Sequence, residues 1–78
     1  MIEDALSGIK KSLALDGFEL TYNVKENVID IFVKAGPAAC TECLVPEGVL
    51  KRMIVRELIE HEVMYERINV HIINVHIP

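Results

Sequence analysis

The spacing of apolar residues switches between two periods along this chain, and the switches limit its fold more than any other feature. Over residues 1–15 the apolar side chains recur every three or four positions, which predicts an amphipathic helix. Residues 18–24 alternate between apolar and polar, and residues 28–33 form a more apolar run. These two stretches predict a β-hairpin whose turn is residues 25–27. Asp16-Gly17 separates the helix from the hairpin, because glycine is favoured just past a helix end.

The rest of the chain predicts a second helix and a third strand. Pro46 suits the first position of a helix, where the N–H that proline lacks is not needed. The helix is expected to fade near Glu62 or Val63, and residues 68–77 then read as a strand. A change of phase at Ile72-Ile73 predicts a β-bulge. The predicted fold is α+β in the order α-β-β-α-β, with two helices packed on one face of a three-stranded mixed sheet.

The expected core draws on both helices and on the hairpin. Its members are Leu6, Ile9, Leu13, Leu20, Ile29, Ile31, Leu50, Ile54 and Leu58. Met53 is expected in the same core, and Met64 is expected to pack near the end of the second helix. The long apolar last strand fits either an edge position, where it pairs with another chain, or a place in mid-sheet.

Size and charge limit the setting in which the chain works. Its 78 residues make one domain, spanning 1–78. The formal net charge is −4 and the basic residues are dispersed, which disfavours nucleic acid as a partner. No apolar run reaches the length of about 18 residues that a membrane span needs, and the acidic start is unlike a signal peptide. The chain is therefore expected in the cytoplasm, where structural disulfides are rare.

The two cysteines of the chain, Cys40 and Cys43, lie close together in the loop before the second helix. Two thiolates at this spacing can bind one metal ion or one iron–sulfur cluster, or can form a disulfide. None of His61, His71 and His76 has motif spacing to the cysteines. Because a structural zinc or a cubane cluster takes four ligands, the simplest complete site uses two cysteines from each of two chains.

Several motifs agree with one known family. Asp16-Gly17 precedes the first strand, Gly36 precedes Cys40-Thr41-Glu42-Cys43, and Val49-Leu50-Lys51 follows Cys43 by six to eight residues. In these motifs and in its order of elements, the chain resembles the C-terminal NifU-like domain of iron–sulfur assembly proteins over nearly its whole length. It departs from that family after the second cysteine, where Leu44-Val45-Pro46 replaces the usual Pro-Ser-Ser.

The resemblance implies a function for the loop. It implies that Cys40 and Cys43 hold an iron–sulfur cluster, that this is a [4Fe–4S] cluster bridging two protomers, and that it is passed to apo-proteins. On this basis residues 1–78 form a single NifU-like domain that is a scaffold or carrier and not an enzyme. Its partners are apo iron–sulfur client proteins and, when the cluster is loaded, a second copy of the chain, with no nucleic acid and no membrane.

Other functions fit the same fold. One alternative is a cofactor-free thiol–disulfide or protein-interaction module. A thioredoxin-like site also has Cys-x-x-Cys at a helix start, but that fold needs a longer chain and more parallel strands. Nucleic-acid-binding modules of the KH type share the order of elements, but they need a Gly-x-x-Gly loop and a basic face. The sequence shows no catalytic constellation, and His71 and His76 are expected on the exposed face of the last strand.

Overall fold

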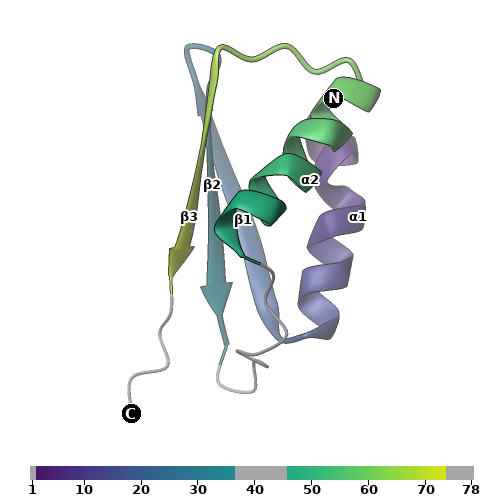
Figure 1. Cartoon of the computed structure of the whole chain (residues 1–78), viewed down its shortest axis with the longest axis vertical. Helices are drawn as coiled ribbons and strands as arrows, with labels where there is room; N and C mark the ends of the chain where they lie inside the picture. The colour runs from purple at the N-terminus through teal and green to yellow at the C-terminus, as the bar shows by residue number, and fades with distance from the viewer. Residues whose placement is uncertain (1, 37–45, 74–78) are drawn as a thin grey trace.

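The elements form in the predicted order. The computed structural model describes residues 2–36 and 46–73. In these ranges the chain forms α1 (Ile2–Leu15), β1 (Phe18–Lys25), β2 (Val28–Ala35), α2 (Glu47–Glu60) and β3 (Arg67–Ile73). Both helices lie on one face of a three-stranded sheet, so the opposite face of the sheet is open (Figure 1). The predicted α+β fold is confirmed.

The sheet is mixed, with β2 in the centre. β1 and β2 are antiparallel, while β3 runs parallel to β2. A parallel neighbour requires the chain to cross back over the sheet, and α2 lies in this crossover. β3 is therefore an edge strand.

The predicted bulge at Ile72-Ile73 is wrong for the described part of β3. Ile72 and Ile73 pair with Val33 and Lys34 in an unbroken register. The apparent change of phase arises because Ile73 is an apolar residue on the open face of the sheet, where it is 44 % exposed.

Two tight turns explain the polar and small residues that flank β1. Glu26 and Asn27 both have positive φ (51° and 64°), as the two-residue hairpin loop that matches strand twist requires. Gly17 ends α1 with φ 87°, where a side chain is unfavourable. A Cβ atom on Gly36 would lie 3.0 Å from the carbonyl oxygen of Gly17, so glycine lets the end of β2 approach the α1–β1 turn.

One core lies between the helices and the sheet. All nine residues predicted for it are buried, together with Ala5, Phe18, Val33, Ala35, Ile68 and Val70. The prediction is wrong for the two methionines, since Met53 is 42 % exposed and Met64 is 88 % exposed. Only a narrow stripe of α2 faces the core, formed by Leu50, Ile54 and Leu58, and Met53 lies beside it.

Both ends of α2 differ slightly from the prediction. Pro46 is the residue before the helix, not its first residue, and its carbonyl accepts the N–H of Leu50 at 2.9 Å. The helix ends at Glu60, because the chain then turns back on itself through two hydrogen bonds to the last turn of the helix. The N–H of Val63 donates to the Leu58 carbonyl at 2.8 Å, and the N–H of Glu62 donates to that of Ile59 at 3.0 Å.

This pattern is a Schellman motif, in which the residue corresponding to Glu62 takes a left-handed conformation. Glu62 has φ 56°. Glycine is the usual residue at that position, and its absence explains why the sequence placed the helix end later than it is. The chain keeps a carboxylate at a position where glycine has a lower conformational cost.

Candidate functional site

The two cysteines predicted to form the site, Cys40 and Cys43, lie outside the described residues, as does His76. The structure describes the two residues that bracket their loop, Gly36 after β2 and Pro46 before α2. The end of β2 and the start of α2 both lie in the lower half of Figure 1. The two residues that bracket the cysteine loop therefore lie toward the same end of the sheet, the end where β2 finishes.

The start of the loop is held against the α1–β1 turn. The N–H of Gly36 donates to the carbonyl oxygen of Gly17 at 3.0 Å, directly after the buried Ala35. Within the turn, the N–H of Gly17 donates a hydrogen bond to the Ala14 carbonyl at 3.0 Å. These contacts fix where the chain leaves the sheet on its way to Cys40.

The other end of the loop leads into the first turn of α2. The side chain of Pro46 accepts no hydrogen bond from the free N–H groups of that turn. These groups carry partial positive charge, which favours a nearby anion such as a thiolate. The carboxylate of Glu47 in the same turn also interacts with this charge and adds a negative charge close to the loop.

The described histidines lie on two different parts of the molecule. His61 is the residue at the C-terminal end of α2. His71 is on the open face of the sheet, where its ring stacks on Phe32 with centroids 4.9 Å apart. Its Nε2 is 3.4 Å from Oδ1 of Asp30, and Asn69 donates to the same oxygen at 3.1 Å. The predicted exposed position of His71 is confirmed.

The cluster around Asp30 is a feature that the sequence did not predict. The signal for it is a single acidic residue inside the apolar run of β2, facing the side of the sheet that the helices leave open. No group of three or more His, Cys, Asp or Glu side chains able to hold a metal occurs within residues 2–36 and 46–73.

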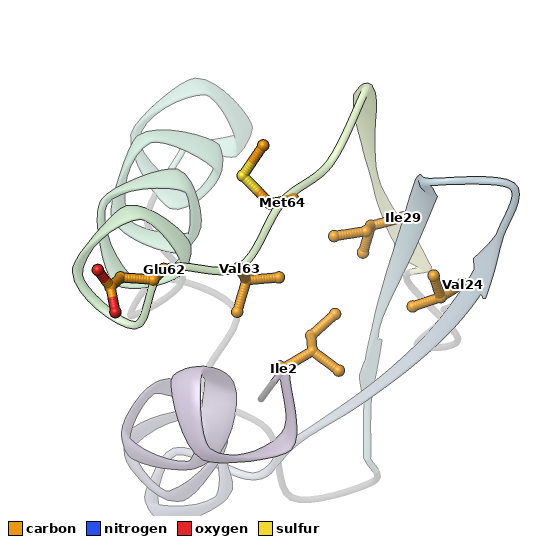
Figure 2. A pocket seen from close by; sticks show the side chains of 6 residues that line it. All are labelled: Ile2, Val24, Ile29, Glu62, Val63 and Met64. Carbon is orange, nitrogen blue, oxygen red and sulfur yellow. The ribbon is translucent and has the colours of Figure 1, made fainter.

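An apolar hollow of about 270 Å³ lies at the end of the sheet where β1 ends and β2 begins, away from Gly36. Three separate parts of the chain form it: the start of α1, the ends of the β1–β2 hairpin strands, and the connection after α2. Its lining residues are Ile2, Val24, Ile29, Glu62, Val63 and Met64. Figure 2 shows Ile2, Ile29 and Val63 directed toward a common space, whereas the carboxylate of Glu62 points away from it. No local sequence pattern predicts such a hollow, because its lining residues are far apart in the chain.

A hydrogen bond ties α1 to β1 close to the hollow. The hydroxyl of Tyr22 donates to a carboxylate oxygen of Glu3. This bond raises the pKa of Tyr22, with smaller contributions from burial and from the negative charge of Glu3. Glu3 follows Ile2 in the sequence, and Tyr22 is on the same face of β1 as Val24. The bond therefore joins two walls of the hollow.

The outer surface of α2 carries a shallower groove of about 480 Å³ with a different character. It is lined by Lys51, Arg52, Val55, Arg56, Ile59 and Glu60, all from one helix. Arg56 and Glu60 form an ion pair at 3.4 Å, and both side chains are largely exposed. An exposed pair of this kind contributes little to stability, at most about 0.5 kcal/mol.

Comparison with known proteins adds no relative to these observations. No protein-family model, curated protein or solved structure matches this chain. Neither α1 nor α2 is long and apolar enough to cross a membrane. The function of the chain has to be inferred from its own residues and from their arrangement.

Proposed function

We propose that this chain is an iron–sulfur cluster scaffold or carrier of the cytoplasm, which holds a cluster through Cys40 and Cys43 and transfers it to apo-proteins. The observation that carries the proposal is the position of Cys40-Thr41-Glu42-Cys43 between β2 and α2 of an α-β-β-α-β domain. The NifU-like domains that this chain resembles have their Cys-x-x-Cys at the same point.

The number of ligands supports a cluster shared between chains. A [4Fe–4S] cluster is held by four thiolates, and each chain has two cysteines. Two copies related by a two-fold axis bring the number to four without any other ligand. The loaded form is therefore a homodimer, with the cluster as its cargo.

The location of the core supports transfer as well as binding. The buried residues come from the two helices and the three strands, and those nine predicted from sequence form most of the core. Burying each large apolar side chain contributes about 1.5–3 kcal/mol. A fold held in this way persists when the cargo leaves, unlike a zinc finger, which unfolds without its ion. A carrier needs this property to accept and release a cluster repeatedly.

Anaerobic reconstitution with iron and sulfide tests the proposal. The wild-type protein is expected to become brown, with broad absorbance in the blue part of the visible spectrum. Cys40→Ser and Cys43→Ser are each expected to remove most of that absorbance, because each removes one sulfur ligand. Thr41→Ala is the matched control, since it changes the same loop and keeps both thiols.

Two results would count against a cluster. Equal absorbance in the Cys40→Ser/Cys43→Ser double variant would show that iron binds elsewhere. A colourless wild type whose cysteines oxidise and reduce reversibly would favour the thiol–disulfide alternative. If the cluster forms, mixing the loaded protein with an apo-ferredoxin tests transfer, and the expected result is loss of the cluster from this chain as the ferredoxin gains it.

A further inference from the structure

We propose that the apolar hollow lined by Ile2, Val24 and Met64 docks a partner protein, through a basic segment of the partner that inserts one bulky apolar side chain. This surface goes beyond the proposed function, because it uses no cysteine and needs no cluster. Four observations carry the proposal: the shape of the hollow, the exposure of its apolar residues, the backbone at Glu62, and the charges around it.

The size and lining of the hollow suit a side chain rather than a small molecule. Its volume of about 270 Å³ is below the roughly 300–1,000 Å³ of typical small-molecule sites. Five of its six lining residues are apolar, so few polar groups are present to orient a small ligand. An apolar anchor of a protein partner needs no such orientation, because the rest of the partner supplies it.

Large apolar side chains are left in water around this hollow. Met64 is 88 % exposed and Val24 is 47 % exposed. Both line the hollow, and they are two of the six large apolar residues that are exposed in the described part of the chain. Methionine is flexible and adapts its shape to a bound surface. A partner that covers Met64 and Val24 would remove both from water.

The backbone at Glu62 is a separate indication. Glu62 occupies the left-handed position of the Schellman motif, with φ 56°. A residue with a side chain has a higher conformational free energy than glycine in that conformation. Residues in this conformation occur at functional sites as well as in turns such as the one at Glu26. Here the retained residue belongs to the lining of the hollow, and Figure 2 shows its carboxylate directed away from Ile2 and Ile29.

The charges near the hollow select the chemistry of the partner. Glu3 and Asp4 lie in the first turn of α1, beside Ile2, and Glu62 lies at the opposite wall. The nearest basic residues in sequence, Lys25 and Arg67, belong to the alternate positions of β1 and β3 and so lie on the open face of the sheet. The helix side of this end is therefore negative, and Lys or Arg residues flanking an apolar anchor would complement it.

A second copy of the chain is a poorer occupant. Each copy carries a formal net charge of −4, so copies repel one another while a basic partner is attracted. One surface of a copy that combines cations with an exposed apolar residue is the outer face of α2, where Ile59 is 64 % exposed. Docking that face into the hollow would be a head-to-tail contact, which builds open chains unless its rotation closes.

The test uses a defined peptide and amide NMR spectra of the reduced protein at low salt. The probe is acetyl-Lys-Lys-Leu-Phe-Lys-Lys-amide. We expect saturable shifts centred on the amides of Ile2, Val24 and Met64, and weaker binding as salt increases. One control peptide replaces every Lys by Glu, and the other replaces Leu and Phe by Ala. Both controls are expected to bind at least about fivefold more weakly.

Two pairs of variants locate the binding surface. Met64→Lys is expected to weaken peptide binding about tenfold, because it places a cation in the hollow. Met53→Lys makes the same change at an exposed methionine of α2 and is expected to leave binding unchanged. Glu62→Gln is expected to weaken binding about threefold through the loss of one charge, whereas Glu19→Gln on the open face of the sheet should have no effect.

Several results would overturn the proposal. These are the absence of saturable shifts at millimolar peptide, equal binding of the acidic peptide, shifts centred on the outer face of α2, and equal effects of Met64→Lys and Met53→Lys. Shifts at the hollow that depend on protein concentration without peptide, and that Ile59→Lys abolishes, would show that a second copy occupies it instead.

Discussion

The two ends of the sheet are built on different principles. At the end where β2 finishes, the proposed cluster site belongs to a single segment of the chain, whose two cysteines are three positions apart in the sequence. At the other end, the hollow forms only when α1, the hairpin and the connection after α2 come together. A loop site can bind its cargo without help from the core, whereas the hollow exists only in the folded domain. The first is suited to a cargo that comes and goes, and the second to recognition of a protein.

The core between the two ends should give the largest effect on stability. Ile54 is fully buried on α2, and Ile54→Ala is expected to lower the free energy of unfolding by about 3 kcal/mol, from lost burial and the cavity left behind. Ile59→Ala on the same helix is the control, since that side chain is 64 % exposed and should change stability by less than about 0.5 kcal/mol. Urea unfolding measures both. Equal losses would show that α2 packs through a different face.

One substitution beside the hollow should raise the stability of the fold while it weakens binding of the basic peptide. Glu62→Gly is expected to raise the free energy of unfolding by about 1 kcal/mol, because glycine adopts the left-handed conformation without a steric penalty. Glu57→Gly, inside α2, is the control and should lower it by about 1 kcal/mol. The same Glu62→Gly variant should bind the basic peptide more weakly. A loss of stability in Glu62→Gly would contradict a Schellman end with Glu62 in the left-handed position.

The link between α1 and β1 beside the hollow should respond to alkaline pH. The pKa of Tyr22 is raised above 10.0 in the folded state, chiefly by its hydrogen bond to Glu3. Its contribution to stability is therefore present below pH 10 and is lost as the pH rises through the raised pKa. The chain has two tyrosines, so Tyr65→Phe leaves Tyr22 as the sole phenol for an absorbance titration.

That titration has a definite control. Its midpoint is expected above 10.0, and adding Glu3→Gln should lower it, because the hydrogen bond and the negative charge are both removed. An unchanged midpoint in Glu3→Gln would mean that Tyr22 and Glu3 do not interact in solution.

The loop end should give the smallest effect on the fold. The Cys40→Ser/Cys43→Ser variant is expected to unfold within about 0.5 kcal/mol of the reduced apo wild type, because the buried residues of both helices and of the three strands already form a core. The reduced apo protein should likewise give a well-dispersed amide spectrum, with any broadening between about Gly36 and Pro46. A poorly dispersed spectrum that sharpens only with metal would make the loop a structural element.

The core could be predicted well from the sequence because buried residues recur at regular spacing within each helix and strand. Leu50, Ile54 and Leu58 repeat at helical spacing, and that spacing alone places them on one face of α2. The end of α2 was predicted near Glu62 or Val63, later than its observed end at Glu60, since the left-handed residue Glu62 is not the glycine that marks such ends.

The two candidate surfaces were not equally visible in the sequence. The cysteine pair is a local motif that the sequence shows directly. The hollow combines Ile2, Val24 and Met64, which are far apart in the chain, so no periodicity connects them. Met64 was expected to pack near the end of α2, and only the fold shows that it is exposed.

The most direct test of the central claim is anaerobic sedimentation of the loaded protein, with iron, sulfide and protein measured in the same fractions. If Cys40 and Cys43 of two copies hold one [4Fe–4S] cluster, the coloured species should sediment as a dimer with about four irons per two chains. Chelating the iron should return it to a colourless, folded monomer. A fully loaded cluster that sediments with a single chain would contradict the shared site, and a dimer that persists without iron would show that the cluster does not hold the two copies together.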